Sequence, residues 1–231
     1  MQIAILCHWR SGSSLTAKIL NLCGMMVGNE ATGWGKVCEP QCEHARLNGV
    51  GNEIYWDISD DLVDLENRAS NILLSYKEQG WKTYGVKVTH VLQDKCWKLF
   101  GPVFKRLWPD AKYVITLRHP AGVCKSLKDA EISEDAIVDS WMSTYNATNE
   151  LVKKGAIVLL YPDSFMPITQ NEIKLAVKKL GLNWSKKADD LLDKKILTRS
   201  AVSDAEVKAF RKKYPEAVKM FDELKKYEVG K

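Results

Sequence analysis

Short apolar segments alternate with longer amphipathic segments along this chain. Four runs rich in valine and isoleucine are predicted as buried strands: residues 3–7 (IAILC), 84–88 (YGVKV), 112–117 (KYVITL) and 156–161 (AIVLLY). Apolar positions recur at helical spacing over residues 60–80, 96–108, 134–155, 170–181 and 203–227. This alternation predicts an α/β fold with three layers, in which a mostly parallel sheet is flanked by helices on both faces.

Glycine and proline predict where several of these helices end or break. Gly80 and Gly155 stand where two helical patterns stop. Gly101-Pro102 is expected to interrupt the helix over residues 96–108, and Pro215 is expected to break or kink the last one. Residues 28–59 show little periodicity and hold several glycines, so they are predicted as a long loop of the kind that often carries function.

Composition fits an ordinary globular protein of one domain, residues 1–231, with 45% hydrophobic and 27% charged residues. No apolar run reaches the ~18 residues of a membrane span, and no leader pattern precedes the first strand, so a cytoplasmic protein is expected. The net charge of +5 comes from the C-terminal part, since residues 151–231 hold 18 Lys and Arg against 11 Asp and Glu. Aromatic residues do not interleave with these basic ones, which argues against a nucleic-acid partner.

Six cysteines are spread along the chain instead of forming a compact disulfide framework. Several occupy apolar positions of predicted elements, as buried free thiols do. Cys38, Cys42 and His44 offer three potential zinc ligands at an unusual spacing. The prediction is therefore that the protein holds no metal.

A polar loop separates the first predicted strand from the helix that follows it, in the sequence CHWRSGSSLTAKIL (residues 7–20). A loop of this kind points backbone N–H groups at an anion, and the helix N-terminus favours negative charge. Arg10 adds a guanidinium suited to phosphate or sulfate, and Gly12 permits close approach. A serine that only caps the helix is the plainer interpretation. The first glycine and the lysine of the nucleotide triphosphatase loop are missing.

A second basic loop, RHPAGVCKSL, follows the strand over residues 112–117. Arg118 stands at the carboxyl end of that strand, and Ser126 follows eight residues later. Ligands of parallel α/β folds bind beyond the carboxyl ends of the strands, so the loops after residues 7, 88, 117 and 161 are expected at one edge. Two basic loops at this edge would suit a ligand that is phosphorylated at two separated points.

In these motifs the sequence resembles the sulfotransferases that use 3′-phosphoadenosine 5′-phosphosulfate (PAPS). RSGSS (residues 10–14) matches their loop [KR]-S-G-[ST]-[ST], and Arg118, Pro120, Ser126 and Leu127 match their 3′-phosphate element in order and spacing. The similarity extends over residues 3–182 to a bacterial-type branch of the family. The resemblance implies a P-loop-like sulfotransferase fold and an enzyme that moves a sulfuryl group from PAPS to an acceptor hydroxyl or amine, without a metal.

The resemblance also implies roles for individual residues. The residues that would cradle the 5′-phosphosulfate are Arg10, Ser11, Gly12, Ser13 and Ser14. Arg118 and Ser126 would hold the 3′-phosphate. Tyr161 would lie near the adenine or, equally, pack against the end of its strand. Arg10 and Lys87 would be the cations that stabilise charge on the departing phosphate.

The base that takes the acceptor's proton has two candidates. Glu39 matches the position where bacterial and carbohydrate-type members carry a glutamate, and it is the favoured one. His90, in KVTH, is similar to the histidine of the cytosolic branch, although its distance from the lysine differs by one residue. A histidine titrates near neutral pH, whereas a glutamate needs a pKa raised by burial.

The acceptor is not identified by the sequence beyond a small molecule, carbohydrate or lipid, and the oligomeric state stays open. Trp34, Tyr55, Trp56 and Trp141 are interpreted as core residues in preference to a substrate wall. Two rival functions remain. One is a small-molecule kinase, and the other is a non-catalytic relative that binds the nucleotide product 3′-phosphoadenosine 5′-phosphate (PAP).

Overall fold

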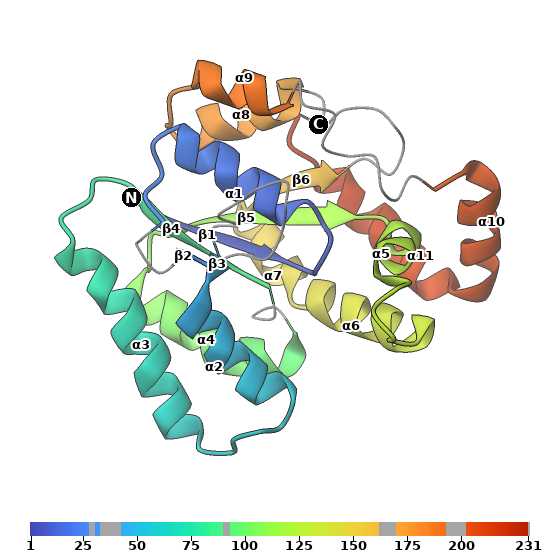
Figure 1. Ribbon diagram of the computed structural model, residues 1–231, viewed down its shortest axis with the longest axis horizontal. Helices are drawn as coiled ribbons and strands as arrows, with labels where there is room; N and C mark the ends of the chain where they lie inside the picture. The colour runs from blue at the N-terminus through green and yellow to red at the C-terminus, as the bar shows by residue number, and fades with distance from the viewer. Residues whose placement is uncertain (28–30, 33–42, 90–92, 162–169, 193–201, 231) are drawn as a thin grey trace.

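The computed structural model describes residues 1–27, 31–32, 43–89, 93–161, 170–192 and 202–230. Its sheet has the strand order β2-β3-β4-β1-β5-β6 (Figure 1). The strands are β1 (Gln2–Cys7), β2 (Ala31–Thr32), β3 (Glu43–His44), β4 (Tyr84–Val88), β5 (Lys112–Arg118) and β6 (Ile157–Tyr161). All pairs are parallel except β2 with β3. The four predicted strands and the mostly parallel sheet are confirmed.

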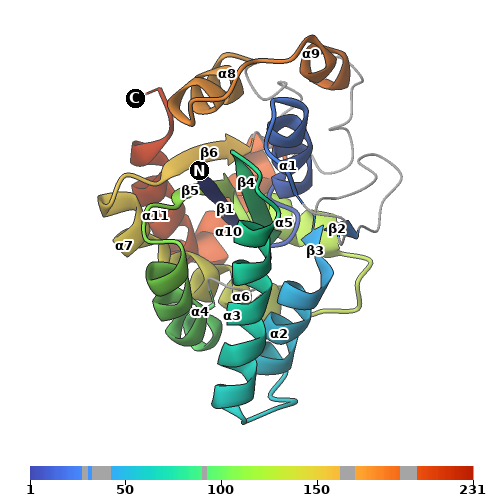
Figure 2. The same ribbon diagram turned by 90° about the vertical axis from the view of Figure 1, so that its left-hand side faces the viewer.

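Helices cover both faces of this sheet, as predicted. They are α1 (Ser13–Leu22), α2 (Ala45–Tyr55), α3 (Leu62–Glu78), α4 (Asp94–Leu107), α5 (Pro120–Leu127), α6 (Glu134–Asn146), α7 (Thr148–Lys153), α8 (Gln170–Lys179), α9 (Lys186–Leu192), α10 (Asp204–Lys213) and α11 (Pro215–Leu224), with a 3-10 turn η1 at Lys225–Tyr227. Helices α1, α8 and α9 lie on one face and α2, α3 and α4 on the other (Figure 2).

Alternate residues of β1 pack into two apolar cores, one on each face of the sheet. Ile3 and Ile5 pack with α1 and α8, whereas Ala4 and Leu6 point into the larger core on the opposite face. This two-sided burial is the reason why the strands read as nearly continuous apolar runs. The register of β1 pairs Leu6 with Val88 of β4 and Cys7 with Thr116 of β5, and this pairing sets the place at which the loop after β1 begins.

Two sequence predictions about local structure are wrong. Gly101-Pro102 does not interrupt its helix, because α4 runs from Asp94 to Leu107 with Pro102 inside it. Phe100 and Phe104 on either side are fully buried, and this burial offsets the hydrogen bond that a proline cannot make. Gly101 also fits a close contact, since a Cβ there would lie 3.1 Å from the ring of Trp97.

The predicted long loop over residues 28–59 is only partly a loop. It contains β2, β3 and the helix α2, which buries Leu47, Val50 and Ile54 against the larger core. These positions have helical spacing, but Gly49 and Gly51 lower the helix propensity between them. Packing of one apolar stripe outweighs that propensity here.

The cysteines that the structure describes are free and buried, as predicted: Cys7, Cys23, Cys96 and Cys124. Burial raises the pKa of Cys96 and of Cys124 to about 12, so these thiols stay protonated and unreactive at neutral pH. Cys38 and Cys42 lie outside the described residues. Within the described part of the chain, no cluster of three histidine, cysteine or acidic side chains is arranged to hold a metal ion.

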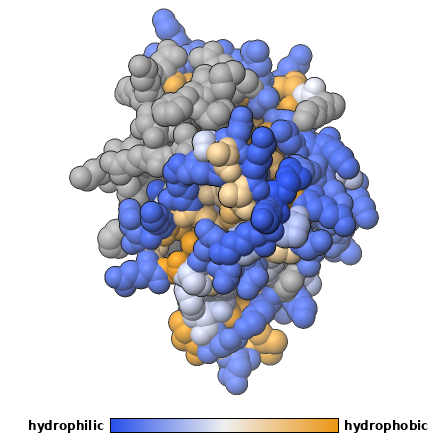
Figure 3. Space-filling view, turned by 90° about the vertical axis from the view of Figure 1, so that its right-hand side faces the viewer, coloured by the Kyte–Doolittle hydropathy of each residue, from blue (hydrophilic) through white to orange (hydrophobic). Residues whose placement is uncertain are grey.

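Large hydrophobic side chains are exposed at the connection between α2 and α3. They are Trp56 and Ile58 in the connection and Leu62 and Val63 in the first turn of α3, and Figure 3 shows hydrophobic surface near the lower end of the molecule. In the ranges that the structure describes, no helix combines the length and the apolar character needed to cross a membrane.

Candidate functional site

The loops predicted to share one edge begin side by side. In the sheet register, Leu6 of β1 is opposite Val88 of β4, and Cys7 is opposite Thr116 of β5. Arg118, which ends β5, is opposite Tyr161, which ends β6. The carboxyl ends of these four parallel strands therefore form one edge, from which α1 returns over the sheet (Figure 1). The shared-edge prediction is confirmed for the strand ends themselves.

The loop after β1 leaves the first turn of α1 without a side-chain cap. Gly12 is the N-cap residue and has φ +84°, and no side-chain cap hydrogen bond is made there. Arg10 also has a positive φ of +59°, which is uncommon for a residue other than glycine. Left-handed residues on either side of Ser11 turn the backbone sharply ahead of the helix. With the uncapped N–H groups of the first turn of α1, this geometry favours an anion. The serine-cap interpretation does not hold for this helix.

The two basic loops contact each other, although more than a hundred residues separate them. Arg10 Nε donates to Ser126 Oγ at 2.8 Å, and Arg118 Nη1 donates to the Arg10 carbonyl oxygen at 3.0 Å. Arg118 is buried at 4% exposure, and its own carbonyl accepts a hydrogen bond from Trp141 Nε1. The structure thus brings together the residues expected at the 5′ and the 3′ ends of the nucleotide.

Tyr161 packs its ring directly on Gly12. A Cβ on Gly12 would overlap the Tyr161 ring, so only glycine fits between the loop and this strand end. The Arg118 guanidinium carbon lies 5.2 Å from the centre of the same ring, within the range of a cation–π contact. Packing at the strand end, one of the two roles expected for Tyr161, is therefore what the structure shows.

Lys87 approaches the loop from the opposite side. It belongs to β4, has 1% exposure, and donates from Nζ to Ser14 Oγ at 2.9 Å. Since β4 and β5 flank β1, Lys87 and Arg118 stand on the two sides of the loop that contains Arg10. Three cationic side chains therefore surround the uncapped end of α1, and this arrangement suits an anion with charge at more than one point.

The serine hydroxyls of the loop differ in direction. Ser11 Oγ donates to the His8 carbonyl at 2.7 Å and lies 2.8 Å from Thr116 Oγ1, at 0% exposure. Ser13 is buried as well, whereas Ser14 contacts Lys87. The Ser11 hydroxyl therefore holds the loop against the end of β5 and is not directed at the ligand side.

Several sequence candidates cannot be placed. Glu39 and His90, the two candidate bases, lie outside the described residues, as does Trp34. Trp141 is fully buried, which agrees with the core interpretation. Trp56 is not a core residue, because 57% of it is exposed.

His8 is a polar residue of the site that no sequence motif singled out. It is buried at 2% exposure, with Nδ1 placed 3.0 Å from the Trp9 carbonyl oxygen and Nε2 placed 3.1 Å from Ser140 Oγ. Burial lowers the pKa of His8 to about 4, so the ring is neutral at pH 7. The sequence offers one clue to His8, its position: a histidine directly after a buried strand lies at the boundary between the protein interior and the loop.

Acidification is expected to destabilise the protein through a second buried histidine, His119. Its Nδ1 caps α5 by accepting from the Ala121 amide, and burial lowers its pKa to about 4 against the opposing influence of Asp222. His119 takes up its proton at a higher pH in the unfolded chain than in the folded protein. The free energy of unfolding therefore falls as pH decreases from 6.5 towards 4. Urea unfolding at pH 7.0 and 5.5 should show the parent losing about 1 kcal/mol relative to His119→Asn, which keeps a cap without titrating. An equal loss in both proteins would contradict this assignment.

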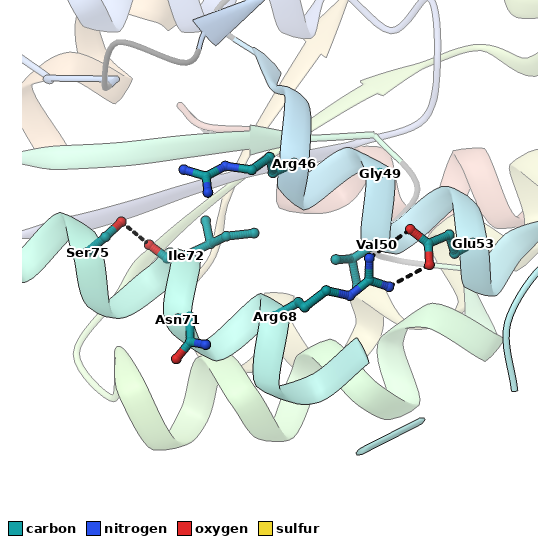
Figure 4. A pocket seen from close by; sticks show the side chains of 8 residues that line it. All are labelled: Arg46, Gly49, Val50, Glu53, Arg68, Asn71, Ile72 and Ser75. Carbon is teal, nitrogen blue, oxygen red and sulfur yellow. Dashed lines mark hydrogen bonds and ion pairs between the residues drawn. The ribbon is translucent and has the colours of Figure 1, made fainter. Parts of the chain in front are cut away.

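A pocket of about 420 Å³ opens between α2 and α3. Its walls carry Arg46, Glu53 and Arg68, and Figure 4 shows Glu53 and Arg68 joined by two parallel hydrogen bonds. This pair lowers the pKa of Glu53, chiefly through the hydrogen bonds from Arg68. None of the residues expected at the nucleotide site lines this pocket. It is a feature of the helical layer and is separate from the strand ends described above.

Comparison with known proteins supports the fold. No family model matches the sequence, and no curated protein matches it. Seven chains of solved structures match. One of them is the sulfotransferase domain from the Synechococcus PCC 7002 olefin synthase, with 14% sequence identity, a TM-score of 0.60, and coverage of 97% of this chain and 94% of that chain. The chain therefore has the α/β fold of a sulfotransferase domain.

Proposed function

We propose that this chain is a PAPS-dependent sulfotransferase, folded as a single domain over residues 1–231. The observation that carries the proposal is the contact between the two basic loops, in which Arg10 bonds Ser126 and Arg118 bonds the backbone of Arg10. A nucleotide with a phosphosulfate at the 5′ position and a phosphate at the 3′ position needs two cationic sites that face one cleft. The sulfotransferase fold of the neighbour adds support.

The side chains of this edge fit such a ligand. Arg10, the first-turn amides of α1 and Lys87 would meet the 5′-phosphosulfate, and Arg118 with Ser126 would meet the 3′-phosphate. Arg118 is nearly fully buried, so its charge acts at low effective dielectric and binds an anion strongly. Lys87 is equally buried, and its charge would act mainly on the negative charge that develops at the 5′ end during the reaction. Tyr161 is in cation–π contact with Arg118 at the β6 end of this edge, and it would be the aromatic side chain next to the adenine.

The reaction is an in-line displacement at sulfur. The bond between sulfur and the bridging phosphate oxygen breaks, a bond from the acceptor oxygen or nitrogen to sulfur forms, and the acceptor proton passes to a base. Glu39 and His90 are the two candidates for that base, with Glu39 favoured. Lys87 and Arg10 would stabilise the negative charge that grows on the departing phosphate, which is the largest contribution expected from a preorganised site. No metal is required.

A calorimetric titration with PAP tests the proposal, with ATP as the competing ligand. Binding of PAP together with release of PAP from PAPS and an acceptor supports the enzyme. Binding of ATP without binding of PAP would instead favour the kinase. Binding of PAP with intact PAPS in the presence of sugar, lipid, phenol and amine acceptors would favour the non-catalytic relative.

Replacing Lys87 with methionine should slow sulfuryl transfer with little change in nucleotide affinity. Lys87 acts on charge that develops in the transition state, so we expect turnover of PAPS to fall about 100-fold and the Kd for PAP to rise less than about tenfold. Release of PAP from PAPS gives the rate, and calorimetry gives the Kd. Lys95→Met is the matched control, because Lys95 forms an exposed ion pair with Asp57. Unchanged turnover in a folded Lys87→Met variant would remove Lys87 from the mechanism.

A further inference from the structure

We propose that His8 is a positioning residue for the anion-binding loop: it holds the Trp9 carbonyl towards the interior, so that the Arg10 amide faces the ligand. Ser140 of α6 and Gln93 at the start of α4 hold the ring in the tautomer that this requires. The inference rests on the proposed function for its ligand, PAP, but its geometric part concerns this chain alone.

The hydrogen bonds around His8 can have only one direction. A carbonyl oxygen only accepts, so the Nδ1 atom at 3.0 Å from the Trp9 oxygen must carry the proton. In the neutral ring Nε2 is then an acceptor, and Ser140 Oγ donates to it across 3.1 Å. Gln93 Nε2 only donates, and it completes the chain by donating to Ser140 Oγ at 2.9 Å. The lowered pKa of His8, about 4, agrees with a ring that stays neutral.

The orientation of one peptide follows from this chain of donors. In a planar trans peptide the C=O and the next N–H point in opposite directions, so an inward Trp9 carbonyl directs the Arg10 N–H away from the interior. Arg10 holds a left-handed conformation at φ +59°, and a strained backbone of this kind persists only where its surroundings over-determine it. A flipped peptide would present a carbonyl oxygen to the incoming anion and repel it.

The chain of donors also ties three parts of the site together. His8 and Gln93 are buried at 2% and 4% exposure, and each follows the end of a strand, β1 and β4 respectively. Ser140 joins them from α6, the helix whose Trp141 bonds the Arg118 carbonyl. The loop after β1, the chain after β4 and the end of β5 are thereby held in one relative position.

Two substitutions of His8 separate positioning from simple packing. His8→Asn keeps a donor near the Nδ1 position, whereas His8→Leu removes it and retains the apolar bulk. We expect the Kd for PAP to rise at least about tenfold in His8→Leu and to stay within about threefold of the parent in His8→Asn. Without the His8 donor the Arg10 amide no longer faces the anion, and a hydrogen bond to a charged ligand contributes about 1.5 kcal/mol or more. Equal PAP affinity in the parent and a folded His8→Leu would overturn the proposal.

Ser140→Ala supplies a second variant in case His8→Leu does not fold. It breaks the chain one step away from His8. Ser75→Ala on α3 is its matched control, since the Ser75 hydroxyl donates to the Ile72 carbonyl of its own helix and takes no part in this chain of donors. The expected result is a weaker affinity for PAP in Ser140→Ala with kcat for bound PAPS nearly unchanged, and no change in Ser75→Ala. A fall in kcat alone would contradict a role in binding the anion.

Nitrogen NMR of the histidine rings, recorded without nucleotide, tests the geometric part by itself. The expected spectrum has His8 protonated on Nδ1 and unprotonated on Nε2, and addition of PAP should move the Arg10 amide resonance. A ring protonated on Nε2 would overturn the inference whether or not PAP binds. If the parent fails to bind PAP while the ring has the expected tautomer, it is the proposed function that fails, and His8 then has no anion to position.

Discussion

Arg118→Ala is expected to weaken PAP binding by at least about 150-fold. A buried guanidinium makes two charge-assisted hydrogen bonds to a phosphate, and each contributes about 1.5 to 3 kcal/mol. Arg118 is 4% exposed and stands where β5 ends, directly beside the loop that holds Arg10. Calorimetric titration of the parent and the variant with PAP measures the change.

Two further variants make this result specific. Arg106→Ala removes an arginine that bonds Ser70 and Glu66 on the surface of the helical layer, so its affinity for PAP should equal that of the parent. Arg118→Lys keeps the charge but loses the planar pair of donors, and it should recover part of the binding energy. Urea unfolding must be measured for both Arg118 variants, because Arg118 also donates to the Arg10 carbonyl and its loss can affect stability. If folded Arg118→Ala binds PAP as the parent does, the second loop does not contact the nucleotide.

The strands were predictable because they are buried on both faces. Ile3, Ile5, Ala4 and Leu6 are all at 0% exposure, and a strand of this kind leaves an apolar run that no turn residue interrupts. The contact between the loops of Arg10 and Arg118 was predictable for a related reason. Parallel strands place their carboxyl ends at one edge, so two loops far apart in sequence become neighbours without any further information.

The helix α2 was not predictable in the same way. Its apolar positions are few, and Gly49 reduces the local preference for a helix. The helix exists because Leu47 and Ile54 reach the core and because Asn48 accepts a hydrogen bond from the Thr89 amide at the end of β4. Both are tertiary contacts, and a local pattern does not contain them.

The directions of the side chains in the loop after β1 were the second feature that could not be predicted from the sequence. RSGSS looks like a row of equivalent hydroxyl donors, but Ser11 is directed at Thr116 and Ser14 at Lys87. The direction of each side chain depends on the left-handed backbone at Arg10 and Gly12. The role of His8 was not predictable either, because its partner Ser140 lies on α6, far away in the sequence, and Ser140 in turn accepts from Gln93 ahead of α4.

Gly12→Ala is expected to reduce the free energy of unfolding by about 2 to 5 kcal/mol. A left-handed backbone costs a residue with a Cβ about 1 to 2 kcal/mol, and forcing a methyl group into a filled space adds about 1 to 3 kcal/mol. Both costs apply here, because Gly12 has φ +84° and its Cβ would overlap the ring of Tyr161. Urea unfolding followed by circular dichroism measures the loss.

Gly155→Ala separates the two contributions. Gly155 has nearly the same φ, +87°, but nothing lies within 4 Å of the position of its Cβ. It should therefore lose only the backbone part, about 1 to 2 kcal/mol. Adding Tyr161→Ala to Gly12→Ala should cost less than the sum of the two single losses, because the ring and the methyl group compete for one space. Equal losses of unfolding free energy in Gly12→Ala and Gly155→Ala would mean that Tyr161 does not occupy the space beside the loop. Another side chain would then have to lie at the β6 end of the proposed nucleotide site.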